Sequence, residues 1–154
     1  MSWRRRQAAA IVAVVATAAV VHVGAVSGIP RLIMQRVADV GARQSGLNRF
    51  AHPPVPTAEA RQIVRPSPDF AYSVCVLDLS RGPVRLQVPL TVPYTSVALF
   101  SGTTDNYFVR NDRDTGGKAL DLVVIGPGTK GALALALPMG AEQVQAPTFT
   151  GLAL

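Results

Sequence analysis

The strongest constraint on this chain is an uncharged apolar run from Ala8 to Ile29. At a rise of 1.5 Å per residue, a helix of about 20 such residues crosses a hydrocarbon layer about 30 Å thick. His22 lies toward the far end of the run, where an imidazole can reach the membrane–water interface. The sequence therefore predicts a transmembrane helix over residues 8–29.

Two interpretations of this run stay open. Val23-Gly24-Ala25 has the small residues of a signal-peptide cleavage site, but the run is longer than the 7–15 apolar residues usual in such signals, which favours an uncleaved anchor. Three adjacent arginines in the tail 1–7 favour a cytoplasmic N-terminus. We expect a single-pass membrane protein with its C-terminal domain outside the cytoplasm. The alternative is secretion after signal cleavage.

The net charge of +6 is confined to the first part of the chain. Residues 1–65 hold nine basic and two acidic residues, a balance of +7, whereas residues 66–154 hold six basic and seven acidic residues, a balance of −1. The second part offers no basic stripe interleaved with aromatic residues, so we expect no nucleic-acid partner. The partner that this distribution favours is the lipid bilayer.

A second helical pattern follows the apolar run. Ile33, Val37 and Val40 recur at helical spacing, Pro30 is acceptable in a first helical turn, and Ser45-Gly46 is a stop signal. We predict a separate juxtamembrane helix and linker over residues 30–47. It would lie on anionic lipid headgroups, through its arginines, or on the domain that follows, or it would be a solvated helix that links the anchor to the domain.

From Ala71 onward the apolar residues follow a period of two. Short runs separated by Gly/Pro turns recur every 8–12 residues, which is typical of an antiparallel sandwich or barrel. The predicted strands are 71–79, 84–88, 94–100, 106–110, 119–125, 133–137 and 143–146. We predict a mainly β fold, an antiparallel β-sandwich or jelly-roll-like domain at 48–154. Cys75 alternates with Leu77 in the first strand and is expected in the core.

Composition and spacing exclude several kinds of site. One cysteine and two histidines cannot build a zinc module. Asp112, Asp114 and Gly117 are spaced like the start of a calcium loop, but its twelfth position is Val123 rather than Glu. His52 has no serine on a strand-to-helix elbow to pair with. We expect no metal and no cofactor, and a binding or assembly module rather than an enzyme.

One polar loop is the predicted ligand-binding site. The prolines of Arg65-Pro66-Ser67-Pro68-Asp69 stiffen the backbone, while the guanidinium of Arg65 and the carboxylate of Asp69 project from it. The hydroxyl of Tyr72 follows three residues later. These groups could clamp a polar group of a small-molecule ligand, or they could lock the loop against the first strand, as turn aspartates often do.

Several segments resemble the bacterial family called domain of unknown function (DUF) 1254. They are Asn48-Arg49-Phe50, Val64–Ser73, Val76–Pro83, Val88-Pro89, Tyr94-Thr95-Ser96, Thr104–Val109 and Val124–Gly128. The resemblance covers roughly residues 48–154 and points to the short, membrane-anchored members. It implies a partner, because longer relatives fuse this domain to a second domain, DUF1214, which a separate chain would carry here. It transfers no catalytic residue. Because the family is bacterial, the resemblance also implies the location, which is the bacterial inner membrane with the C-terminal domain in the periplasm, or the periplasm after signal cleavage.

Two functions are consistent with these features. The first is a single-pass membrane protein that displays a DUF1254-like β domain outside the cytoplasm, as a non-catalytic binding or assembly module working with a DUF1214-type partner. The alternative is an envelope enzyme or small-ligand carrier with its site at Arg65, Asp69 and Tyr72.

Overall fold

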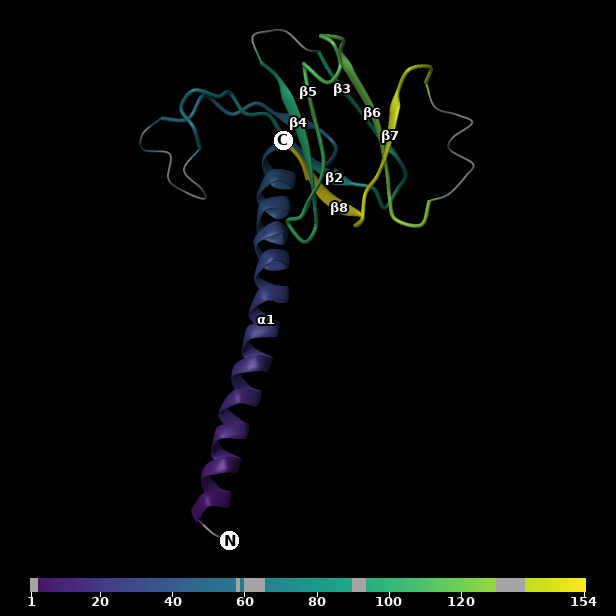
Figure 1. Ribbon diagram of the computed structural model, residues 1–154. Helices are drawn as coiled ribbons and strands as arrows, with labels where there is room; N and C mark the ends of the chain where they lie inside the picture. The colour runs from purple at the N-terminus through teal and green to yellow at the C-terminus, as the bar shows by residue number, and fades with distance from the viewer. Residues whose placement is uncertain (1–2, 58, 60–65, 90–93, 130–137) are drawn as a thin grey trace.

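The computed structural model describes residues 3–57, 59, 66–89, 94–129 and 138–154, and shows one long helix followed by a β domain (Figure 1). The elements are α1 (Trp3–Ser45), β1 (Phe50–Ala51), β2 (Val74–Asp78), β3 (Val84–Val88), β4 (Ser96–Ser101), β5 (Asn106–Asn111), β6 (Leu120–Ile125), β7 (Glu142–Gln145) and β8 (Thr150–Ala153). The predicted strand 133–137 lies outside the described residues. The predicted mainly β domain behind an apolar N-terminal helix is confirmed.

The helix α1 continues through Pro30, where the sequence predicted a boundary between two helices. Proline has no N–H to donate to the carbonyl of Val26, and its ring crowds that turn. The helix tolerates this loss. The side chain of Arg31 donates a hydrogen bond to the carbonyl of Ser27 in the same turn. One helix therefore joins the apolar run to the β domain, in place of the separate juxtamembrane helix.

The β domain is a sandwich of two sheets. The first, sheet A, has the order β1-β2-β8-β4-β5, and the second, sheet B, has the order β3-β6-β7. Sheet A and the β3–β6 pair are antiparallel as predicted, but β6 and β7 are parallel. The long connection between these two strands returns the chain to the same end of the sheet, which permits parallel pairing.

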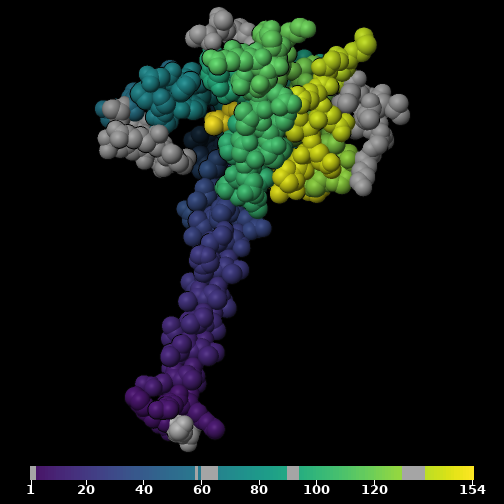
Figure 2. All heavy atoms as spheres, viewed as in Figure 1, coloured from purple at the N-terminus to yellow at the C-terminus, as the bar shows by residue number. Residues whose placement is uncertain are grey.

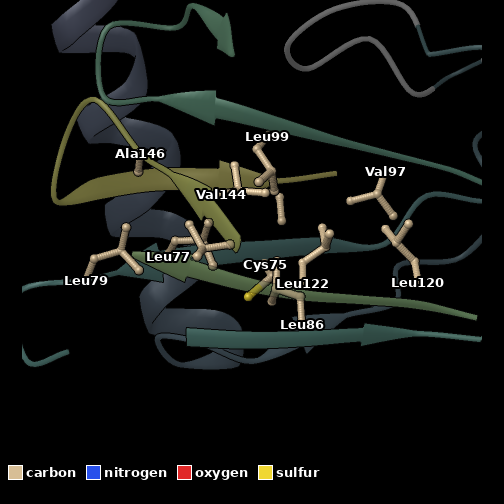
Figure 3. Packing of buried hydrophobic residues seen from close by; sticks show 12 residues of the cluster. Cys75, Leu77, Leu79, Leu86, Val97, Leu99, Leu120, Leu122, Val144 and Ala146 are labelled. Atoms are coloured by element: carbon tan, nitrogen blue, oxygen red, sulfur yellow. The ribbon is translucent and has the colours of Figure 1, made fainter. Parts of the chain in front are cut away.

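The core lies between the sheets and is built by the alternation of side chains along the strands. Leu77 of β2, Leu99 of β4 and Leu122 of β6 have no exposed surface (Figure 3). Each such side chain contributes about 1.5–3 kcal/mol to stability by leaving water. Cys75 lies among them, fully buried and unpaired, so the prediction that it is a core residue is confirmed.

The C-terminal part of α1 covers the outer face of sheet A. Val76 points away from the core, yet it is only 2% exposed because α1 packs over it. At Gly41 the approach is so close that a Cβ would lie 2.6 Å from Cγ2 of Val76. Met34 and Ala38, on the same face of the helix, are also buried. This part of α1 therefore lies on the domain, one of the two placements expected from the sequence.

One ion pair links the two sheets at their edges. The guanidinium of Arg110 in β5 lies 2.8 Å from the carboxylate of Glu142 in β7, and it also lies 5.0 Å from the ring centroid of Phe108. A second pair, Arg85 with Asp121, joins β3 and β6 within sheet B through two hydrogen bonds. Both pairs are partly solvent-exposed, so they add less to stability than the apolar core.

Candidate functional site

Only part of the predicted ligand-binding loop lies in the described structure. Arg65 is outside the described residues. The hydroxyl of Tyr72 accepts a hydrogen bond from the backbone N–H of Ser67 at 3.1 Å, and the N–H of Asp69 donates to the hydroxyl of Ser67 at 3.3 Å. Ser67 thus holds the loop from both sides. The side chain of Asp69 is exposed and free to meet a ligand or partner.

An aromatic pair stands beside this loop. The rings of Phe70 and Tyr94 meet edge to face with centroids 6.4 Å apart, and each residue is 48% exposed. Edge-to-face packing keeps the two rings in place while leaving about half of each in water. The sequence analysis missed this pair because the two residues are 24 positions apart and come from different loops. Together with Asp69, they form a surface that combines an acidic group with apolar area.

His52 has a serine partner that the sequence did not indicate. Its Nδ1 lies 2.8 Å from the hydroxyl oxygen of Ser73, and its ring stacks on Phe50 at 6.2 Å. The pair joins the segment after β1 to the start of β2, and Ser73 lies on extended chain rather than on a strand-to-helix elbow. The arrangement ties the chain after β1 to the start of β2 and is unlike the exposed nucleophile that a hydrolase needs.

The polar stretch before β6 forms a turn closed by its own side chains. The carbonyl oxygen of the Asn111 side chain accepts hydrogen bonds from the N–H groups of Arg113 and Asp114, and the Asp114 carboxylate accepts one from the N–H of Asn111. These oxygens are therefore engaged by the backbone, as expected for Asn and Asp in turns. Within the described ranges, no three His, Cys, Asp or Glu side chains cluster as metal ligands.

Two groups in the domain have strongly raised pKa values. Burial between the sheets raises the pKa of the Cys75 thiol to about 11, and burial raises the pKa of the Tyr107 hydroxyl to about 12. Both effects have the same cause, because a low-dielectric surrounding disfavours the charged form. Neither group is ionised near neutral pH, so neither can act there as a nucleophile or base.

Four connections meet at one end of the sandwich, which we call the base. They are residues 79–83, 102–105, 126–129 and 146–149, and the strand pairings place them together. The base lies toward the N-terminal part of α1. Gly41 contacts Val76 in the middle of β2, whereas Arg31 and Met34 lie beside the base. Figure 2 shows this end of the domain projecting over the helix.

A groove of about 410 Å³ separates the base from α1. Arg31, Met34 and Asp39 line the helix side of this groove. The domain side consists of the 102–103 turn and residues 148–150. One wall thus carries a cation, an anion and a thioether, and the other carries hydroxyls, backbone and an aromatic ring. The groove is partly open to solvent and does not enclose a small molecule as a deep pocket would.

Hydroxyl groups make the base rigid. The hydroxyl of Thr103 donates to the Asp105 carboxylate at 2.5 Å and lies 2.7 Å from the hydroxyl of Ser101, which is 1% exposed. The N–H of Gly102 donates to the hydroxyl of Thr148 at 2.8 Å, which fastens the 102–105 turn to the connection before β8. The bond between Gly102 and Thr148 joins residues 46 positions apart, so no local sequence pattern could have indicated the groove.

The family of the chain follows from its β domain. A family model described as "Protein of unknown function (DUF1254)" matches residues 47–154, which is the whole region after α1 and its first turn. The chain belongs to the DUF1254 family. The predicted family is therefore confirmed, with a boundary one residue from the expected one. No curated protein matches the chain.

A solved structure shares the fold of this DUF1254 chain. The VPA0106 protein from Vibrio parahaemolyticus matches with a TM-score of 0.60 and 14% identity, over 84% of this chain and 31% of the other. The DUF1254 chain thus spans about a third of the length of that relative. The matched 84% is a larger share than the family region, so it also takes in part of α1. The end of the helix belongs to the shared fold.

Proposed function

We propose that this protein is a single-pass membrane protein that displays its DUF1254 domain outside the cytoplasm as a non-catalytic binding or assembly module. The observation that carries the proposal is the continuity of α1. The helix has the length and composition of a membrane anchor or a signal sequence, and its exposed apolar part runs without a break into a segment that packs on sheet A. A helix fastened to the domain at one end is well placed to anchor it.

The proposed companion is a chain with a DUF1214-type domain. The match to the VPA0106 protein supports a companion, because the matched fold makes up only about a third of that longer chain and leaves room for a further domain. In this protein, the surface formed by Asp69, Phe70 and Tyr94 is a candidate contact for such a companion. Exposed aromatic side chains are enriched at protein interfaces, and these two are already held in one orientation.

Copurification of the full chain in mild detergent tests the module proposal. We expect a stoichiometric protein partner that carries a DUF1214-type domain, and we expect Phe70→Ser to weaken its retention. Val109→Ser, which alters an equally exposed residue on β5, is the matched control and should retain the partner. A tightly bound small molecule without any protein partner would contradict the module and favour the alternative.

That alternative is an envelope enzyme or small-ligand carrier with its site at Arg65, Asp69 and Tyr72. The exposed carboxylate of Asp69 beside two aromatic rings favours it, because such a surface can bind a ligand with a cationic or polar group. Because the hydroxyl of Tyr72 accepts a hydrogen bond from the backbone of Ser67, we assign Tyr72 a positioning role in this alternative.

The anchor and its orientation have a separate test. We expect the protein isolated from bacterial inner membranes to keep its N-terminal residues and to resist extraction at alkaline pH. Protease added to spheroplasts should digest the β domain and leave the tail 1–7 protected. A mature N-terminus at Val26 would show that a signal peptide had been removed, and it would overturn the anchor.

A further inference from the structure

The base of the β domain lies close to the point where the apolar run of α1 ends. That run stops at Ile29, and the groove under the base is lined by Arg31 and Met34. At 1.5 Å per residue, Met34 is only about 8 Å farther along the helix axis than Ile29. The headgroup region of a bilayer is about 5–7 Å thick on each side of its hydrocarbon core. If α1 spans the membrane, Arg31 lies within the headgroup layer, about 3 Å beyond Ile29, and the base, which meets Arg31 and Met34, lies at the outer edge of that layer.

The residues of the base have the chemistry of a surface that meets headgroups. Thr104 contributes an exposed hydroxyl, Thr103 and Thr148 use theirs in hydrogen bonds within the base, and the remaining positions are mostly Gly, Pro and Ser. The four connections hold one basic and one acidic residue, Arg81 and Asp105. Since this balance is neutral, the base is not repelled by anionic lipid. At the opposite end, by contrast, Asp69, Asp112 and Asp114 are kept away from the bilayer.

One side chain of the base is suited to enter the interface. Phe149 is 50% exposed. Its ring is held on one side by Gly126, where a Cβ would lie 2.8 Å from the ring carbon Cε1. The absence of a side chain at Gly126 lets the ring approach the end of β6 closely, while half of the Phe149 surface stays uncovered within the described structure. A held, half-uncovered Phe ring at the edge of the headgroup layer is of the kind that enters the interface in surface-bound helices.

We propose that the base docks on the headgroup layer of the same bilayer that α1 spans, with Phe149 inserted among the headgroups and Arg31 beside a lipid phosphate. Arg31 uses one guanidinium nitrogen on the Ser27 carbonyl, and a guanidinium has further N–H groups to donate. The covalent continuity of α1 identifies the occupant, because the bilayer is the one partner that this helix brings to the base. This inference rests on the proposed membrane anchor.

A fluorescent probe at position 149 tests the docking. The full chain carrying Phe149→Cys is labelled with an environment-sensitive dye and reconstituted into vesicles of phosphatidylethanolamine and phosphatidylglycerol. Native Cys75 is buried with a raised pKa, so the folded protein is labelled at the new cysteine. We expect a shift of emission to shorter wavelength, and quenching by headgroup-attached spin labels that is several-fold stronger than at Met139→Cys. Met139 is fully exposed before β7, at the opposite end from the base.

Pro147→Cys provides a second probe at the base, because Phe149 packs on Gly126 and its loss could disturb the fold. Stronger quenching at 147 and 149 than at 139 supports the docking. Equal quenching at all three positions, in chains that resist alkaline extraction from the vesicles, would overturn the docking and leave the anchor intact. Chains released by alkaline extraction would instead contradict the anchor itself.

Discussion

The side chain of Cys75 is an example of how position alone determines reactivity. It lies between the two sheets with no exposed surface, and burial raises the pKa of its thiol to about 11 from an ordinary value of 9.0. Because only the thiolate is nucleophilic, a rise of two pKa units lowers the reactive fraction about 100-fold at any pH below 9. Cys75 is therefore a packing residue.

We expect maleimide to label the folded protein at Cys75 at least ~100-fold more slowly than the protein unfolded in urea. The thiol should also affect stability at high pH. Its pKa is higher in the folded state, so its contribution is fully present below pH 9 and is lost as the pH rises toward 11. Cys75→Ala should reduce this loss in urea titrations. Equally fast labelling of folded and unfolded protein would show that the thiol is accessible.

The contact between α1 and sheet A belongs to the scale of elements. It depends on Gly41, whose missing side chain allows the helix backbone to approach Val76, and on the buried side chains of Met34 and Ala38. Helix and sheet are also joined by the turn at residues 46–49, where Asn48 makes three hydrogen bonds to the backbone of Val76 and Asp78 in β2. The close approach at Gly41 and this turn therefore together hold the domain on the helix.

Gly41→Leu should loosen this contact, because its Cβ would already lie 2.6 Å from Cγ2 of Val76. Overpacking of this kind costs about 1–3 kcal/mol. We expect a lower urea midpoint for the β domain and faster proteolysis near residues 46–49. Val40→Leu, which changes the adjacent and 53% exposed residue, is the matched control and should behave like the parent protein. Equal effects of the two substitutions would refute the role of Gly41.

The elements also show which parts of the fold the sequence can predict. β3 and β6 were both predicted, β3 because its side chains alternate between core and surface, and β6 because it is a short apolar run bounded by turn residues. β1 and β8 were missed, since two residues in one case and Thr-Gly-Leu-Ala in the other are too short for a period of two to appear. The parallel pairing of β6 with β7 depends on non-local contacts, which alternation does not report.

The candidate sites show the same contrast between local patterns, which the sequence reveals, and non-local contacts, which it does not. Asp69 and Tyr72 were chosen from a local pattern, and the structure places them in one loop held by Ser67. The groove beside the base was not predicted, because it joins Arg31 to residues about 70 and 120 positions later. Helical continuity through Pro30 was missed for another reason. The local preference of proline for a helix start was outweighed by packing of α1 on the domain.

At the scale of the whole molecule, the C-terminal part of α1 has two roles. It extends the apolar run that the anchor proposal requires, and it completes the fold by covering sheet A, as the match to the VPA0106 protein over part of the helix also indicates. A signal peptide cleaved after Ala25 would leave this second role unchanged, because Met34, Ala38 and Gly41 all follow the cleavage point. The domain is thus the β-sandwich together with the second part of α1.

This view predicts different stabilities for two shortened chains. Residues 31–154 keep the covering helix, whereas residues 47–154 contain only the family region and expose Val76. Burial of one valine contributes about 1.5–3 kcal/mol, so we expect a clearly higher urea midpoint for 31–154. Binding of a hydrophobic dye should be stronger for 47–154. Equal midpoints would mean that the helix end adds nothing to the domain.

Because α1 continues without a break from the apolar run to sheet A, no flexible linker separates that run from the domain. In the anchored form, the domain would keep one height and one tilt above the bilayer and could turn only about the helix axis. A companion in the same membrane would then search in two dimensions and meet the same face at every encounter. Much of the freedom that association normally removes, at a cost of several kcal/mol, would already be absent before contact.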